Sequence, residues 1–193
     1  MPLNVLLLGP QGAGKGTQAT RISAEYGIPH IASGEILRGE MAAGTDLGNR
    51  VRDVIDRGDL VPDDLMIELI RNRLEQPNTE AGFVLDGFPR TLVQAEALDS
   101  ILSDIGRSFS VVFALQIPDR VAFERLQRRA QLEGRADDTD EAIQRRLDLY
   151  HQATEPLIEH YRTRGRLVPI HGDRRENEVF AEIQQALEQV PAA

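Results

Sequence analysis

The sequence predicts an α/β protein with three layers, in which a five-stranded parallel sheet is flanked by helices. Apolar runs recur along the 193 residues and are continuous rather than alternating, which is typical of strands buried on both faces of a parallel sheet. Segments with helical periodicity separate these runs. Strands that alternate with helices favour right-handed crossovers within one α/β fold, and the length suggests a single domain.

Five apolar runs bounded by turn residues are the expected strands. They cover residues 4–8, 30–31, 83–85, 110–117 and 167–170. We expect one helix to follow the first strand and to end near Tyr26, and apolar stripes at helical spacing predict others. These stripes span residues 65–74, 92–105, 143–161 and 179–190. Pro156 interrupts the third of them, so we expect a kink or a division there.

Two segments depart from the alternation of strand and helix. Residues 33–62 contain two glycine-punctuated helical segments without a strand, and residues 128–140 are polar around Gly134. We therefore expect one domain over residues 1–193. Its core is formed by residues 1–31, 62–127 and 139–193, with a helical insertion at 32–61 and a short mobile lid at 128–138.

Composition excludes several classes of protein. The 22 Lys and Arg residues against 31 Asp and Glu give a net charge of −9, which argues against a nucleic-acid-binding protein. The absence of cysteine rules out disulfides, thiolate metal sites and thiol nucleophiles. No apolar run approaches the roughly 18 residues that span a bilayer, and the first residues lack the charged start of a signal peptide. We expect a cytoplasmic monomer with no membrane partner.

A glycine-rich segment, GPQGAGKGT, runs from Gly9 to Thr17 between the first strand and the first helix. Glycines let backbone N–H groups turn inward around a phosphate, and the helix N-terminus adds a positive field. Lys15, the only lysine in the chain, would reach the β- and γ-phosphates. The strict pattern G-x-x-x-x-G-K-[ST] is missed by one residue, because Gly16 precedes Thr17. The segment predicts binding of a nucleoside triphosphate.

The single lysine excludes two classes of nucleotide-binding protein. A GTPase with an N-K-x-D segment would need a second lysine, and a protein kinase carries its lysine on a strand separate from its glycine loop. A P-loop phosphotransferase and a nucleotide-binding module without hydrolysis both remain.

Three motifs in order resemble the adenylate kinases of the nucleoside monophosphate kinase family, over nearly the whole chain. They are Lys15-Gly16-Thr17, the run FVLDGFPRT from Phe83 to Thr91, and GRADD from Gly134 to Asp138 with Arg146 further along. The lid of about ten residues without cysteine resembles the short-lid form, which carries no structural zinc. The resemblance implies Mg²⁺-dependent, reversible transfer of the terminal phosphoryl group of ATP to AMP, giving two ADP for adenine nucleotide homeostasis.

The resemblance also implies the site residues. The insertion would be the monophosphate-binding segment, Asp86 would orient Mg²⁺ through water, and Asp137 and Asp138 would act in lid closure. The ATP-binding residues would be Gly12, Ala13, Gly14, Lys15, Gly16, Thr17, Arg125, Arg129, Gly172 and Arg174. The AMP-binding residues would be Ser33, Arg38, Asp59, Leu60, Val61, Gly87, Phe88, Pro89, Arg90, Gln94, Arg135 and Arg146. The catalytic residues would be Lys15, Arg90, Arg129, Arg135 and Arg146.

Several of these residues also have an ordinary structural interpretation that needs no bound nucleotide. Ser33 has the sequence context of a helix N-cap, Asp86 that of a turn or cap residue, and Gln94 that of an exposed helical residue. The arginines between positions 125 and 146 would suit a solvated helix face. The four histidines are scattered and are read as ordinary polar residues.

The predicted reaction needs no general base, because the acceptor is already an anionic phosphate oxygen. Positioning and electrostatic stabilisation would supply the catalysis. A UMP/CMP kinase of the same architecture is the nearest alternative, and Thr91 with Gln94 favours AMP by resemblance. A nucleotide sensor without turnover is the other alternative, but it would have no use for arginines that bridge donor and acceptor.

Overall fold

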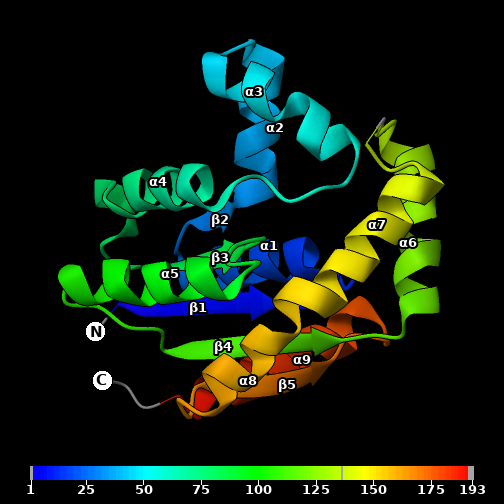
Figure 1. The fold of residues 1–193 in the computed structure, drawn as a ribbon. Coiled ribbons are helices and arrows are strands. Elements are labelled where there is room, and N and C mark those ends of the chain that lie inside the picture. The colour runs from blue at the N-terminus through cyan, green and yellow to red at the C-terminus, as the bar shows by residue number, and fades with distance from the viewer. Residues whose placement is uncertain (1, 136, 191–193) are drawn as a thin grey trace.

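A computed structural model describes residues 2–135 and 137–190 of the chain. Its centre is a sheet of five parallel strands in the order β2-β3-β1-β4-β5 (Figure 1). The strands are β1 (Leu3–Leu8), β2 (His30–Ala32), β3 (Gly82–Asp86), β4 (Val111–Gln116) and β5 (Leu167–His171). The predicted fold class and the predicted positions of all five strands are confirmed.

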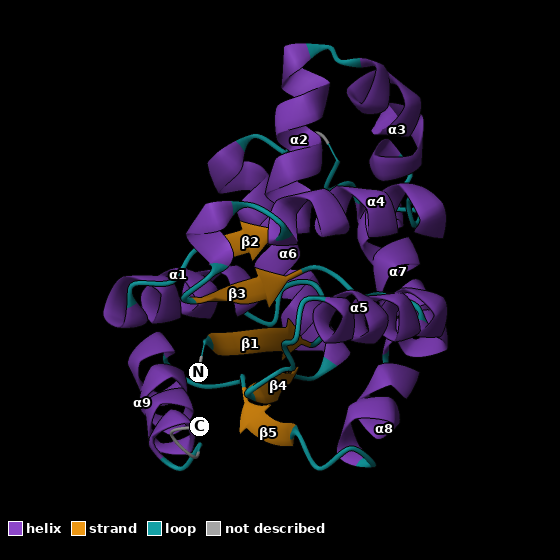
Figure 2. Cartoon of the chain, turned by 90° about the vertical axis from the view of Figure 1, so that its left-hand side faces the viewer, coloured by secondary structure: helices purple, strands orange, loops and turns teal. Residues whose placement is uncertain are grey.

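Helices cover both faces of the sheet. Figure 2 shows α1 (Lys15–Tyr26) and α9 (Glu176–Glu188) on one face, and α5 (Leu92–Asp104) and α8 (Pro156–Arg162) on the other, where α4 (Asp63–Leu74) packs beside α5. Alternate residues of β1 belong to different clusters: Leu6 packs in the core on the α5 side and Leu7 in the core on the α1 side. The apolar runs are continuous because each strand faces a core on both sides.

Residues 33–62 contain two helices and no strand, as the sequence predicts. Helices α2 (Ser33–Ala43) and α3 (Asp46–Asp56) pack against each other and project beyond the sheet edge at β2 (Figure 1). Thr45 caps α3 through a hydrogen bond from the Gly48 backbone N–H to its hydroxyl, 3.1 Å long. Gly48 packs so closely on α2 that a Cβ at this position would overlap the Glu40 backbone.

Two further helices stand opposite the insertion. They are α6 (Asp119–Glu133) and α7 (Asp140–Leu149), and a π-helical turn, η2 (Tyr150–Thr154), joins α7 to α8. Pro156 is the first residue of α8, so the division predicted in this stripe is confirmed. A short 3₁₀ helix, η1 (Pro77–Thr79), precedes β3.

Local differences from the sequence-based expectations concern helix ends and faces. The helical segment continues to Glu133, so the first half of the predicted excursion at residues 128–138 lies within α6, and Gly134 ends that helix with a φ of 62°. Leu92 and Ile105, expected on the buried face of α5, are exposed, whereas Ile101 is buried. The predicted domain boundaries at residues 1 and 193 lie outside the described residues.

The helices within residues 2–135 and 137–190 are either too short or too polar to cross a bilayer. None of them combines the length and the apolarity that a crossing requires.

The close contact of α2 with α3 predicts opposite effects for two glycine substitutions. Gly48→Ala forces the insertion helices apart and lowers the free energy of unfolding by about 1–3 kcal/mol. Gly39→Ala, on the exposed side of α2 with nothing within 4 Å of its Cβ, raises it by about 0.5–1 kcal/mol through helix propensity. Urea unfolding measures both, and equal effects would contradict the described packing.

Candidate functional site

The glycine-rich loop lies between the end of β1 and the start of α1. Gly12 and Gly14 have φ values of 81° and 90°, and a Cβ at Gly12 would lie 2.7 Å from the Ala122 carbonyl oxygen, so this turn favours glycine. No side chain caps the N-terminus of α1 among the described residues. Its first N–H groups are therefore available to an anion, as the P-loop prediction requires.

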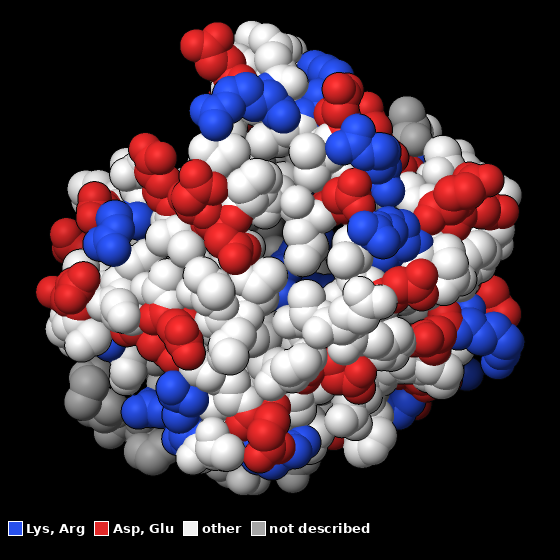
Figure 3. Space-filling view, in the orientation of Figure 1, with Lys and Arg blue, Asp and Glu red and all other residues white. Residues whose placement is uncertain are grey.

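A cavity of about 1050 Å³ opens beside this loop, bounded by the insertion on one side and by α6 and α7 on the other. In Figure 3, basic side-chain atoms are visible at the bottom of the depression at the centre of the face. The predicted site residues that line the cavity come from five segments of the chain. They are Gly12, Ala13, Gly14, Lys15, Gly16 and Thr17; Ser33, Arg38, Asp59, Leu60 and Val61; Asp86, Gly87, Pro89, Arg90 and Gln94; Arg125, Arg129, Arg135 and Arg146; and Gly172 and Arg174.

Phe88 does not line the cavity. Its side chain is 1% exposed and packs in the core cluster on the α5 side of the sheet. The Phe88 side chain therefore points into the core and not into the cavity, and its predicted place among the AMP-binding residues stays a prediction. Ala136 of the third motif lies outside the described residues.

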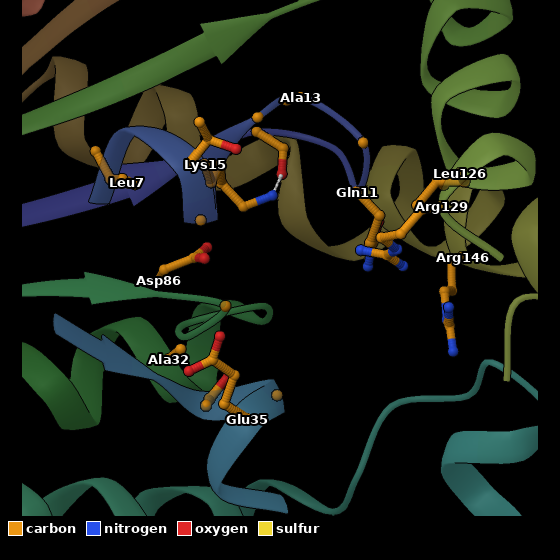
Figure 4. Close-up of a pocket in the computed structure, with 18 of the residues that line it drawn as sticks. Leu7, Gln11, Ala13, Lys15, Ala32, Glu35, Asp86, Leu126, Arg129 and Arg146 are labelled. Carbon is orange, nitrogen blue, oxygen red and sulfur yellow. Dashed lines mark hydrogen bonds between the residues drawn. The ribbon is translucent and has the colours of Figure 1, made fainter. Parts of the chain in front are cut away.

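Lys15 and Asp86 occupy one end of the cavity. Figure 4 shows Lys15 beside the loop and Asp86 at the end of β3, with Arg129 and Arg146 extending toward the cavity from the other side. The Lys15 ammonium donates hydrogen bonds to the Gly9 and Pro10 carbonyl oxygens, both 2.8 Å long. The loop's own carbonyl groups thus satisfy this charge.

Electrostatics at this end depend on burial. Burial lowers the pKa of Lys15 to about 8, against a smaller raising effect of Asp86. Burial on its own would raise the pKa of the Asp86 carboxyl, but contact with His30, 3.9 Å away, and the charge of Lys15 outweigh it, so that this pKa lies below its ordinary value. Asp86 is therefore ionised at neutral pH.

The arginines at the other end are held by carboxylates of the lid. The Asp138 side chain is fully buried and pairs with Arg129 at 2.7 Å and with Arg146 at 2.5 Å. Asp137 pairs with Arg146 at 2.9 Å, and Glu133 with Arg135 at 2.6 Å. Acidic side chains of the chain itself thus balance these three arginines, in positions where phosphate oxygens could replace them.

The cationic groups also affect one another. Burial lowers the pKa of Arg90, and the charge of Arg146 lowers it further. The pKa of Arg38 is likewise lowered by burial and then by the charge of Arg135. Both shifts mean that added positive charge is unfavourable here, and a bound polyanion would relieve this repulsion.

Two residues differ from the simplest interpretation of the sequence. Ser33 does not cap α2, because Ala32 occupies the N-cap position. Its hydroxyl oxygen is buried without a hydrogen-bond partner among the described residues, and the residue lines the cavity. Gln94 is 2% exposed rather than solvated. Both residues therefore present polar atoms to the cavity from buried positions.

The segment after β5 closes the opposite side of the phosphate loop. An Arg125 guanidinium N–H donates to the Gly172 carbonyl oxygen at 3.1 Å, and Arg174 donates to the His171 carbonyl at 3.1 Å. Arg125 also lies 3.9 Å from the Asp173 carboxylate. These contacts join α6 to the end of β5 beside the loop.

Sequence reasoning missed other residues at the cavity. Tyr150 and Thr154 line it from η2, and the Thr154 hydroxyl donates to the Arg90 carbonyl oxygen at 2.8 Å. Both residues lie at positions of the apolar stripe predicted over residues 143–161, so the sequence pattern did not distinguish them from core residues. His30, read as an ordinary polar residue, lies next to Asp86 because β2 and β3 are adjacent, with His30 in register with Val84.

The donor set at Asp86 fits a magnesium ion bound with phosphates. Mg²⁺ needs only one or two carboxylates when phosphate oxygens and waters complete its coordination. Asp86 supplies one carboxylate, and its Oδ2 lies 3.6 Å from an ideal Cβ at Gly16, so it faces the start of α1. No group of three or more acidic or histidine side chains suited to a metal ion occurs among the residues described.

A parallel sheet whose first strand leads through a glycine loop into a helix N-terminus defines a P-loop nucleotide-binding protein. The family model for adenylate kinase matches residues 7–166. The adenylate kinase of Thermus thermophilus is 49% identical over 183 residues, covering 95% of this chain and 96% of that protein. The adenylate kinase of Micrococcus luteus is 46% identical over 189 residues (98% and 92%), and that of Stenotrophomonas maltophilia is 43% identical over 185 residues (96% and 99%). The chain belongs to the adenylate kinase family.

The lowered pKa of Lys15 predicts a pH-dependent affinity for nucleoside triphosphate. Because burial lowers the pKa of Lys15 to about 8 in the free protein, binding of a polyanion above that pH must restore the proton. The Kd for ATP should therefore rise by up to tenfold per pH unit above about pH 8. Calorimetric titration over the alkaline range measures this dependence. The Lys15→Gln variant should bind weakly at every pH, and a wild-type Kd that stays flat through the alkaline range would contradict the assignment.

Proposed function

We propose that this chain catalyses the Mg²⁺-dependent, reversible transfer of the terminal phosphoryl group of ATP to AMP, giving two ADP. Membership of the adenylate kinase family supports this activity. The observation that carries the proposal is the cavity that joins the phosphate loop, the insertion and the arginines of α6 and α7. One cavity of this kind can hold a donor and an acceptor together, which a binding module for a single nucleotide does not need.

The donor triphosphate would bind at the loop. Backbone N–H groups from Gly12 to Thr17 and the Lys15 ammonium would hold its β- and γ-phosphates. Arg125, Gly172 and Arg174 lie where the adenosine end would leave the loop. Asp86 would hold Mg²⁺ through water, and the ion would neutralise phosphate charge.

The acceptor would bind between the insertion and the turn after β3. Ser33, whose buried hydroxyl lacks a partner among the described residues, and Arg38 would bind its phosphate together with Arg90. The backbone of Asp59, Leu60 and Val61 would flank the base, with Gln94 facing its edge. Gly87 and Pro89 border the same space.

Transfer would join an oxygen of the AMP phosphate to the γ-phosphorus of ATP while the bond from that phosphorus to the β,γ-bridging oxygen breaks. The acceptor oxygen is anionic from the start, so no proton has to be removed. Lys15, Arg90, Arg129, Arg135 and Arg146 would stabilise the charge on the equatorial oxygens. Neither histidine nor cysteine lines the cavity among the described residues, which suits a direct transfer.

Closure of the insertion (32–61) and of the lid (128–138) over a core formed by the rest of the chain would exclude water during transfer. The insertion already contacts α7 of the core: Arg145 pairs with Asp59 at 2.9 Å, and Arg146 donates to the Ile55 carbonyl oxygen at 3.3 Å. Phosphate oxygens would take the places that Asp137 and Asp138 now occupy on the arginines.

We further propose a short-lid enzyme without structural zinc, acting as a cytoplasmic monomer. The absence of cysteine supports the first point, since structural zinc sites commonly rely on thiolates. The net charge of −9 argues against nucleic acid as a partner, and we propose no membrane partner.

³¹P NMR of the protein with ATP and Mg²⁺, and with AMP, CMP or UMP in separate samples, tests the proposal. ADP should form much faster with AMP. Turnover only with CMP or UMP would indicate a pyrimidine nucleotide kinase, and binding of ATP without transfer to any acceptor would indicate a sensor.

Arg90→Ala should lower kcat by about 10²–10³-fold, because one preorganised cation is lost from the site of charge development. Steady-state kinetics in a coupled ADP assay measures the effect. Arg120→Ala is the matched control, since Arg120 is exposed on α6 and its ion pair is with Glu124 of the same helix. A kcat for Arg90→Ala close to that of the wild type would show that Arg90 takes no part in the transfer step.

A further inference from the structure

The Gln94 side-chain amide is held from both sides. The Arg90 backbone N–H donates to Gln94 Oε1 at 2.7 Å, and Gln94 Nε2 donates to Asp63 Oδ1 at 2.8 Å. A backbone N–H can only donate and an ionised carboxylate can only accept. The chemistry of the two neighbours therefore fixes which end of the amide carries oxygen and which carries nitrogen.

Asp63 is itself fixed in place. It is the first residue of α4, whereas Gln94 lies in the first turn of α5. The Thr91 hydroxyl donates to the same Asp63 oxygen at 3.0 Å and accepts from the Gln94 backbone N–H at 3.2 Å. The carboxylate is thus shared between the cap of α5 and the Gln94 amide, and a rotation of that amide would break a network that spans two helices.

Rotation of the amide by half a turn would be unfavourable in this buried position. The NH₂ group would face the Arg90 N–H, donor against donor, and the carbonyl oxygen would face the Asp63 carboxylate, acceptor against acceptor. Buried groups left unpaired in this way are costly, and Gln94 is 2% exposed. The Gln94 amide therefore faces the cavity in a single orientation.

We propose that Asp63 is a specificity-determining positioning residue, which holds the Gln94 amide in the orientation that accepts a 6-aminopurine and rejects a 6-ketopurine. The inference rests on the proposed binding of the acceptor base at Gln94. After its two internal bonds, the amide keeps one lone pair on Oε1 and one hydrogen on Nε2. Adenine offers a donor at N6 beside a ring-nitrogen acceptor, which complements this pair.

Hypoxanthine presents the opposite pattern, with an acceptor at O6 beside a donor at N1. Uracil likewise presents a keto oxygen beside an N–H, whereas cytosine presents an amino group beside a ring acceptor, as adenine does. The orientation held by Asp63 consequently separates amino bases from keto bases. It does not separate AMP from CMP.

Asp63→Asn tests this role because asparagine keeps the shape and an acceptor oxygen but can also donate, which removes one of the two constraints on the Gln94 amide. The ratio of kcat/KM for AMP to that for inosine monophosphate should fall by about tenfold, within the discrimination typical of one bidentate pair. Most of the change should come from KM. The ratio for AMP to CMP should stay within about twofold, because the two bases present the same pattern.

Asp64→Asn is the matched control. Asp64 is the next residue in the first turn of α4 and is exposed, so its substitution removes the same charge from the same helix end without touching Gln94. Its base preference should equal that of the wild type. An equal loss of AMP and inosine monophosphate activity in Asp63→Asn, an unchanged ratio, or the same shift in Asp64→Asn would overturn the proposal. Failure of the wild type to phosphorylate AMP would instead overturn the proposed function.

Discussion

Positive charge gathered around one cavity is the constraint on which the rest of the structure depends. The chain carries a net charge of −9, yet Lys15 and several arginines meet at one place. These cations are balanced locally: Lys15 by loop carbonyls, and Arg129 and Arg146 by the buried Asp138. Charges balanced in this way can lie close together, and the oxygens of a polyanion are suited to the same guanidinium groups.

The parallel sheet brings these groups together. The carboxyl ends of β1, β3, β4 and β5 meet at one edge, where ligands bind in open α/β sheets. β1 leads into the phosphate loop, β3 ends at Asp86, and β5 ends just before Gly172. Burial of the central strands on both faces gives the edge a rigid base, while the insertion and the α6–α7 pair stand above it.

The strands, the loop and most of the cavity lining could be predicted from the sequence, because continuous apolar runs and local motifs determine them. The environments of individual side chains could not, since they depend on contacts between distant segments. Gln94 is held in place by Asp63 of another helix, and Phe88 packs in the core although its neighbours Gly87 and Pro89 line the cavity. The expected excursion at residues 128–138 begins inside α6, because polar residues do not by themselves end a helix, and this helix continues until Gly134 stops it.

We propose that the protein transfers a phosphoryl group directly between two nucleotides held in one positively charged cavity, by positioning and electrostatics. The stereochemistry at phosphorus tests it most directly. With ATP made chiral at the γ-phosphorus by oxygen isotopes and with AMP as acceptor, the ADP formed from AMP should show inversion of configuration. Retention would mean two successive displacements through a phosphorylated side chain and would contradict it.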